Sequence, residues 1–199
     1  MEPILFIVTG PSGAGKGTVM RALLERVPDL QKVVTYTTRP PRPGEQDGFD
    51  YHFVDPTRFM AMVRAGEIFE YERVYHDFYY GSPRNLFPGG SDGLMELDYK
   101  GHQKYRALLP QVVAIFLLPP SLEELRRRIL GRSEVSNLDA RLKNAVEQLR
   151  HAREYDYVVT NDDWERCAER VATLMQAERW RRQGRGELAA MLEEIEANP

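Results

Sequence analysis

The chain has 199 residues, of which 42% are hydrophobic, and a formal net charge of −3 at pH 7. These values predict a globular protein with one substantial core and small inserted subdomains. The slightly acidic balance argues against general binding to nucleic acid or membrane surfaces and is compatible with small anionic substrates. Cys167 is the only cysteine, so we expect no intrachain disulfide. We also expect no signal peptide and a cytoplasmic location, with neither nucleic acid nor membrane as a partner.

The first pattern along the chain is a strand, a glycine-rich loop and a helix. Residues 4–8 are apolar and predict a buried strand, and residues 16–26 have helical periodicity. Between them the backbone can fold around a polyphosphate with its N–H groups pointing inward, and the helix N-terminus adds partial positive charge. The predicted phosphate-binding residues are Gly10, Ser12, Gly13, Ala14, Gly15, Lys16, Gly17 and Thr18.

This loop departs from the usual phosphate-binding pattern at one position. Gly17 stands where a Ser or Thr hydroxyl usually holds Mg²⁺, and Thr18 follows one residue later. We therefore expect phosphates, waters and a distant carboxylate to hold the metal. The alternative is a glycine-rich turn that binds nothing, which the strand and helix on either side disfavour.

A proline- and arginine-rich segment comes after the next predicted strand, residues 33–37. Its prolines exclude a helix over residues 38–48 and stiffen the loop. Arg39 and Arg42 can each present a planar donor fork to phosphate oxygens. The alternative is a solvated loop with no ligand.

Residues 50–82 read as a compact insert. Residues 50–54 predict a strand, Asp55 predicts the cap of a helix that ends near Gly66, and residues 68–74 predict a strand with two glutamates on one face. Residues 79–82 close a hairpin. His52 and His76 lack metal-ligand spacing, so we expect them to be surface or packing residues.

A pair of carboxylates follows an ordered loop at residues 82–93. Residues 94–98 predict a core strand that carries Glu96 and Asp98 on one face, near its carboxyl end. A nucleobase edge, Mg²⁺ or an arginine would each be a suitable partner. The alternative is a strand end that exposes two acids to water.

The second half of the chain alternates helices with strands. We expect helices at residues 101–109 and 140–152, strands at 112–118 and 157–160, and a helix that begins at Ser121 with a capping box. The arginines between residues 126 and 141 suggest a hinged lid, although Arg126 and Arg127 fit a solvated helix face better. Residues 164–180 and 187–197 predict two further helices, the second loosely attached. The alternation implies a mainly parallel sheet covered on both faces.

Several runs together resemble guanylate kinases, in the same order along the chain: residues 35–45, 47–53, 79–82, 96–101 and 157–161. The similarity spans nearly the whole sequence. It implies an α/β, P-loop NTPase three-layer fold with a mainly parallel central sheet, a small mixed α+β insert that binds GMP and a short helical lid. The implied core comprises residues 1–34, 83–125 and 142–199, the insert residues 35–82, and the lid residues 126–141.

The resemblance also implies a function and roles for individual residues. The expected reaction is ATP-dependent phosphorylation of GMP, and also dGMP, with Mg²⁺, by a monomer or homo-oligomer. The implied phosphoryl-transfer residues are Lys16, Arg128, Arg132 and Arg141, and the implied contact for the ATP base is Asn161. The implied GMP-binding residues are Thr35, Arg39, Arg42, Tyr51, Glu70, Tyr80, Ser82, Glu96 and Asp98. Mg²⁺ would be held mainly by phosphates and water, with Thr18 or Glu96 as possible protein ligands.

The chemistry of guanine supports this assignment independently. Guanine presents two donors, N1–H and the N2 amine, which carboxylates can accept, whereas adenine would turn an acceptor nitrogen towards them. Two alternatives stay open: a related kinase with another phosphate acceptor, and a binding module of the same fold without catalysis. Gly17, Lys100 in place of a common Gln, and short connections at residues 82–93 and 133–139 depart from the family pattern.

Overall fold

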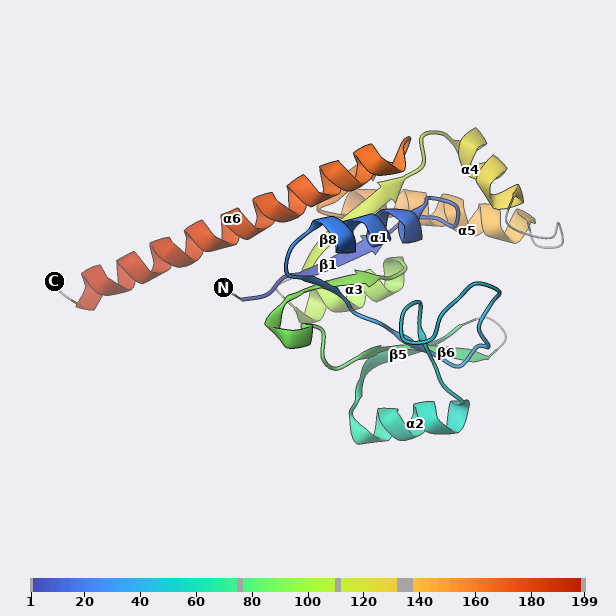
Figure 1. Ribbon diagram of the computed structural model, residues 1–199, viewed down its shortest axis with the longest axis horizontal. Helices are drawn as coiled ribbons and strands as arrows, with labels where there is room; N and C mark the ends of the chain where they lie inside the picture. Colours follow the sequence, from blue (N-terminus) through green and yellow to red (C-terminus); the bar gives the residue numbers. More distant parts are fainter. Residues whose placement is uncertain (1, 75–76, 110–111, 132–137, 198–199) are drawn as a thin grey trace.

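The computed structural model describes residues 2–74, 77–109, 112–131 and 138–197. Within them the chain forms a five-stranded sheet in the order β2-β7-β1-β8-β9 and a four-stranded sheet in the order β4-β3-β6-β5. Figure 1 shows the two sheets as separate parts of the molecule, with a long C-terminal helix running out from the larger part.

The larger sheet is parallel and is centred on the first strand. β1 (Leu5–Thr9) pairs with β7 (Asp92–Glu96) on one side and β8 (Val112–Leu118) on the other. β2 (Leu30–Lys32) and β9 (Tyr157–Thr160) complete its edges, also in parallel. The carboxyl ends of β1 and β7 therefore meet at one edge, which is where open parallel sheets bind ligands.

Helices cover both faces of this sheet because the side chains of β1 alternate between two buried clusters. Phe6 and Val8, together with Ile4 just before the strand, pack with residues of α1 (Lys16–Arg26) and α6 (Trp164–Ala197). The intervening Leu5 and Ile7 pack with Tyr105 of α3 (Tyr99–Leu108) on the other face. This alternation produces three layers, and it confirms the predicted α/β fold class.

The smaller sheet is mixed and lies between β2 and β7 in the sequence. Its strands are β3 (Tyr36–Thr37), β4 (His52–Phe53), β5 (Ile68–Val74) and β6 (Phe78–Pro83). β5 and β6 form an antiparallel pair, whereas β3 and β4 run parallel. Helix α2 (Pro56–Ala65) packs against it through the buried ring of Phe59, which stacks on Tyr79. As predicted, the Asp55 side chain caps α2, and Gly66 ends it with a left-handed φ of 71°.

Two helices connect β8 to β9. Ser121 caps α4 (Leu122–Leu130) by accepting a hydrogen bond from the Glu124 N–H. The buried side chains of Leu125 and Ile129 pack against Ala145 of α5 (Leu138–Arg150). Short 3₁₀ helices, η1 (Pro88–Gly90) and η3 (Ala152–Glu154), lie before β7 and after α5.

Some predicted boundaries were wrong. The predicted strand over residues 94–98 ends at Glu96, and Asp98 is instead the N-cap of α3, where its side chain accepts the Gly101 N–H at 2.9 Å. Residues 33–37 are not one strand, because β2 ends at Lys32 and β3 begins at Tyr36. The strand predicted over residues 50–54 is limited to β4.

The two predicted C-terminal helices are one continuous helix, α6, of 34 residues. No proline occurs between residues 164 and 197, so every position there can donate its backbone N–H. Two glycines in the predicted gap each cost a helix about 1 kcal/mol relative to alanine, which does not by itself end one. No helix in the described part of the chain is both long and apolar enough to cross a membrane.

A buried ion pair joins α6 to the central sheet. Asp92, at the start of β7, accepts the Ile4 N–H at 2.7 Å with one carboxylate oxygen and the Arg179 Nε–H at 2.7 Å with the other. Arg179 also donates to the Pro28 carbonyl at 2.8 Å. Asp92 therefore connects three separate segments of the core.

We expect Asp92→Ala to lower the free energy of unfolding by about 3 kcal/mol, because it leaves a largely buried guanidinium and a backbone N–H without their partner. Urea denaturation measures the change. Glu147→Ala is the matched control, since Glu147 pairs with Arg150 on an exposed helix face and should cost less than about 1 kcal/mol. Equal small losses in both variants would contradict a structural role for the Asp92 pair.

Candidate active site

The predicted phosphate loop lies between β1 and α1, as the sequence indicated. Gly15 is the N-cap of α1 in a left-handed conformation, with φ of 85°, and it provides no side chain to cap the helix. A Cβ at this position would collide with the Asn161 side chain, so the loop needs glycine there. The N–H groups of the first turn are therefore left without a side-chain cap, which suits an anion.

Lys16 folds back over this loop. Its Nζ donates to the Gly10 carbonyl at 2.7 Å and the Pro11 carbonyl at 3.2 Å, and lies 3.5 Å from Glu96 Oε1. Glu96 ends β7, the neighbour of β1 in the sheet. The parallel pairing thus places a cation and a carboxylate beside the loop.

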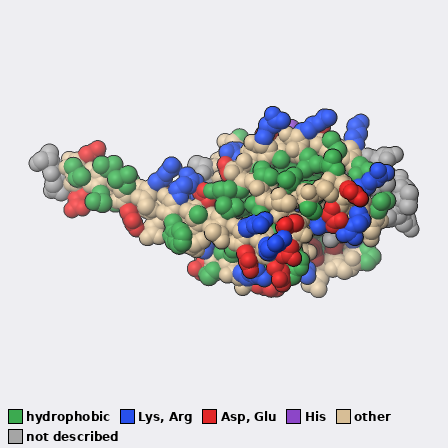
Figure 2. Space-filling view, turned by 90° about the horizontal axis from the view of Figure 1, so that it is seen from above, with side chains coloured by type: hydrophobic (Ala, Val, Ile, Leu, Met, Phe, Trp, Pro, Cys, Tyr) green, Lys and Arg blue, Asp and Glu red, His purple; other side chains and the backbone are tan. Residues whose placement is uncertain are grey.

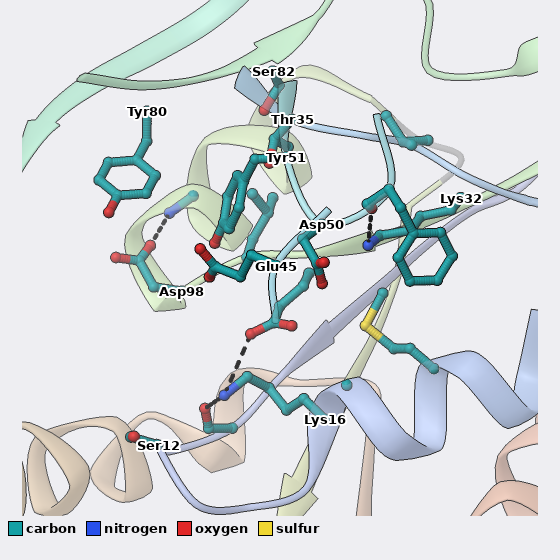
Figure 3. A pocket seen from close by; sticks show the side chains of 18 of the residues that line it. Ser12, Lys16, Lys32, Thr35, Glu45, Asp50, Tyr51, Tyr80, Ser82 and Asp98 are labelled. Atoms are coloured by element: carbon teal, nitrogen blue, oxygen red, sulfur yellow. Dashed lines mark hydrogen bonds and ion pairs between the residues drawn. The ribbon is translucent and has the colours of Figure 1, made fainter. Parts of the chain in front are cut away.

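A pocket of about 610 Å³ extends from the phosphate loop to the smaller sheet. Figure 3 shows Ser12 and Lys16 on one side of it and Thr35, Tyr51, Tyr80 and Ser82 on the other. The sequence-predicted residues that line it are Gly10, Ser12, Gly13, Gly15, Lys16, Gly17, Thr35, Arg39, Arg42, Tyr51, Glu70, Tyr80, Ser82, Glu96 and Asp98. Residues from separate parts of the sequence therefore share one cavity.

Arg39 is held in this pocket by a carboxylate. Its Nη1 and Nη2 each donate to a Glu45 oxygen at 2.7 Å, Nη1 also donates to the Pro40 carbonyl, and Nε donates to the Tyr80 hydroxyl at 3.2 Å. The hydrogen bonds from Arg39 hold the pKa of the Glu45 carboxyl below its usual value. These contacts use four of the five guanidinium N–H donors. The donor fork expected to face a phosphate therefore faces Glu45.

Aromatic rings complete the surroundings of Arg39. Its guanidinium carbon lies 5.3 Å from the ring centroid of Tyr51 and 5.6 Å from that of Phe53. Tyr51 and Tyr80 meet edge to face with centroids 5.9 Å apart. Burial raises the pKa of the Tyr51 hydroxyl, so it remains a neutral donor at physiological pH. Arg42 is exposed at the rim of the pocket.

The opposite wall combines a hydroxyl with carboxylates. Glu70 on β5 faces Ser82 on β6, and the Ser82 hydroxyl donates to Glu70 Oε1 at 3.0 Å. Lys104 of α3 places its Nζ 3.3 Å from Glu70 Oε2. Asp98 lies near the start of the same helix. Strand pairing and one helix N-terminus thus assemble a polar wall from residues up to 34 positions apart.

A second hollow, of about 400 Å³, lies on the other side of the phosphate loop. Gly13 and Gly15 line both hollows, whereas Thr18, Arg128 and Asn161 line only this one. The Asn161 amide donates to the Ala14 carbonyl at 2.6 Å, and Arg128 Nε donates to Glu124 at 2.7 Å. Arg132 lies outside the described residues, and so does the side chain of Arg141, a residue of α5.

Sequence reasoning assigned no role to several residues of the larger pocket. Lys32, Glu45, Phe49, Asp50 and Glu72 all line it. Lys32 donates to the Phe49 carbonyl, and its Nζ lies 4.5 Å from that ring's centroid. Burial lowers the pKa of the Lys32 ammonium. The only available signal was for Glu45, an acid two residues after Pro43 and close to two arginines in the sequence. The position of Lys32 depends on how β2 packs.

Three comparisons with known proteins agree with this arrangement. The family model for guanylate kinase matches residues 2–178. The guanylate kinase of Dechloromonas aromatica is 43% identical over 178 residues, which cover 87% of this chain and 88% of that protein. The guanylate kinase of Caldanaerobacter subterraneus is 40% identical over 186 residues, 90% of each chain.

A solved structure is similar as well. The crystal structure of guanylate kinase from Anaplasma phagocytophilum superposes with a TM-score of 0.73 at 37% identity, covering 88% of this chain and 86% of that one. The family-model match, residues 2–178, spans both sheets and the phosphate loop. The chain therefore belongs to the guanylate kinase family.

Proposed function

We propose that this protein transfers the terminal phosphoryl group of ATP to GMP. A phosphate oxygen of GMP forms a bond to the γ-phosphorus, the bond from that phosphorus to the bridging oxygen breaks, and GDP and ADP result. The observation that carries the proposal is a single pocket lined by the phosphate loop on one side and the Arg, Tyr and carboxylate set on the other. Two anionic nucleotides can meet there end to end.

The phosphate loop is the proposed site for the ATP phosphates. Because Gly13 and Gly15 border both hollows, ATP can place its base near Asn161 and direct its terminal phosphate past Lys16 into the larger pocket. Lys16 would then exchange its carbonyl partners for phosphate oxygens and stabilise charge on the transferring group. Arg128, Arg132 and Arg141 remain proposed lid cations.

The GMP phosphate is proposed to bind at Arg42, Tyr51, Tyr80 and the remaining donor of Arg39. Glu45 balances the charge of Arg39 and fixes its plane before the ligand arrives, which reduces the entropy lost on binding. Arg42 then supplies the net positive charge, and the tyrosine hydroxyls supply neutral donors. This division of roles refines the earlier expectation that both arginines act alike.

The guanine base is proposed to bind between Glu70, Ser82, Thr35 and Asp98. The carboxylates accept from N1–H and the N2 amine, and the hydroxyls donate to O6 or N7. Glu70 is already oriented by Ser82 and Lys104. Residues 35–82 would thus act as the GMP-binding insert and residues 126–141 as the lid, with the remainder as the core.

Mg²⁺ fits the residues present if substrate phosphates provide most of its ligands. No group of three or more His, Cys, Asp or Glu able to hold a metal occurs among the described residues. Mg²⁺ on a nucleotide commonly needs only one or two carboxylates besides phosphates and waters. Glu96, beside Lys16, is the proposed protein ligand, because Thr18 borders the other hollow. The ion would neutralise phosphate charge during transfer.

A positioning role for Lys104 can be tested. We expect Lys104→Met to raise the KM for GMP about tenfold with little change in kcat, because Lys104 orients Glu70 equally in the ground state and the transition state. Lys104→Arg should recover most of the loss. Lys100→Met is the matched control, since Lys100 contacts Glu72, 3.6 Å away. A KM unchanged in Lys104→Met would remove Lys104 from this role.

A coupled assay tests the proposed function directly. ATP and Mg²⁺ are supplied with a panel of nucleoside monophosphates and sugar phosphates, and ADP formation is followed. GMP should be the best acceptor, with dGMP also used. Faster turnover of a sugar phosphate would favour a related kinase, and GMP binding without ADP formation would favour a binding module.

A further inference from the structure

The end of α6 projects from the body of the protein. Figure 1 shows the helix running beyond both sheets, and Figure 2 shows its end as a protruding rod that carries apolar and acidic side chains. Every residue from Gln183 to Ala197 is exposed. This part of α6 therefore packs against nothing else in the described chain.

One face of the projecting helix is apolar. Leu188, Met191, Leu192 and Ile195 are each at least half exposed, at 57%, 62%, 50% and 63%. Gly184, Leu188, Met191 and Ile195 follow one another at spacings of four, three and four residues, which places them along one side of an α-helix and is typical of a helix-pairing seam. We call Gly184, Leu188, Met191, Leu192 and Ile195 together the α6 seam.

Tertiary packing stabilises only the first half of α6, and the projecting segment lacks it. Isolated helices of its length are marginal in water, and two glycines in the segment weaken it further. A Cβ added at Gly184 or Gly186 would meet nothing within 4 Å, so contacts within the protein do not require glycine at these positions. At Gly184, however, the absence of a side chain leaves room for another helix to approach closely.

The charges along the segment indicate what that partner is. Arg181 and Arg185 lie at the N-terminal end of the seam, where Arg181 also pairs with Glu178, and Glu193, Glu194 and Glu196 lie at its far end. Neither Arg185 nor Glu196 forms an ion pair with another described residue. A segment with one basic end and one acidic end is complementary to itself when reversed.

We propose that the α6 seam binds the α6 seam of a second copy of this chain in an antiparallel pair. With 3.6 residues per turn, a dyad between Leu188 and Met191 places Gly184 opposite Ile195 of the partner subunit. The large side chain then fills the space that glycine leaves. The same register places Glu196 of the partner subunit between Arg181 and Arg185.

The antiparallel direction follows from charge and shape. A parallel pair would set arginine beside arginine and glutamate beside glutamate, which is unfavourable. It would also bring two bodies together at one end of the pair, whereas the antiparallel arrangement keeps them at opposite ends. The family model ends at residue 178, so the seam lies outside the matched region. Association and phosphoryl transfer can therefore be tested separately.

Sedimentation equilibrium of the full chain is the first test. The wild type should be a dimer at micromolar concentrations, and Leu188→Asp with Ile195→Asp should be a monomer with unchanged kcat/KM for GMP. Leu108→Asp is the matched control, because Leu108 on α3 is 60% exposed; this variant should remain a dimer. A monomeric wild type, or a dimer that survives the double substitution, would overturn the proposal. A monomeric wild type that binds phospholipid vesicles through the seam would also overturn the proposal.

Cross-linking tests the direction of the pair. Mixing the variants Gly184→Cys and Ile195→Cys under oxidised glutathione should give a mixed disulfide dimer, and neither variant alone should cross-link efficiently. Cys167 is buried and is unchanged in both. Self-cross-linking of each variant would indicate a parallel pair and refute the proposed register. Arg185→Glu and Glu196→Arg should each weaken the dimer, and their combination should restore it.

Discussion

Replacing Lys16 with alanine is expected to lower kcat by several orders of magnitude while the protein stays folded. Lys16 belongs to the phosphate loop and lines the larger pocket, and its contacts in the structure are two loop carbonyls and Glu96. A fixed cation that stabilises charge developed in the transition state has a large effect on rate because it needs no reorganisation during the reaction.

The fold should tolerate this change because removing the Lys16 side chain leaves no buried charge without a partner. Glu96 is 44% exposed in its side chain and can be hydrated when Lys16 is absent. The measurement is steady-state turnover with ATP and GMP, together with thermal unfolding of both proteins. Lys143→Ala, an exposed lysine on α5, is the matched control and should retain normal activity. Near-normal turnover of Lys16→Ala would refute the proposed role of the loop.

The second large effect concerns the base. The wild type should prefer GMP to AMP by a factor on the order of 10⁴ in kcat/KM, because polar groups placed to pair with guanine are left unpaired by adenine. Adenine presents an amine where guanine has O6, and an acceptor nitrogen where guanine has N1–H. Equal rates with the two nucleotides would contradict the assignment of Glu70, Ser82 and Asp98.

Glu70→Gln tests which group reads the base. The amide keeps the shape of the side chain and its contact with Ser82, but it replaces a carboxylate acceptor with a weaker one and adds a donor. We expect kcat/KM for GMP to fall about 10²-fold, with much less change for AMP. Glu67→Gln is the matched control on the exposed surface before β5. A uniform loss for both bases would point to general damage rather than base recognition.

Local sequence patterns were sufficient wherever a structure depends on nearby residues. The glycine-rich loop between β1 and α1, the cap at Asp55, β5 and β8 lie where periodicity and capping predicted them, because apolar spacing, proline and capping side chains act within a few residues. The boundary at Asp98 could not be found this way, since a carboxylate after a strand can either extend it or cap a helix. The packing of α3 against the sheet decided between these.

The site shows the same division. The sequence alone determined which residue types are available for two nucleotides: a glycine-rich loop with Lys16, a stiff arginine loop and a set of carboxylates. Only the tertiary structure decided that Glu45 occupies the fork of Arg39, that Lys104 holds Glu70, and that Thr18 and Glu96 border different hollows. Such pairings depend on how strands and helices distant in sequence come together, and no local propensity encodes the directions in which their side chains meet.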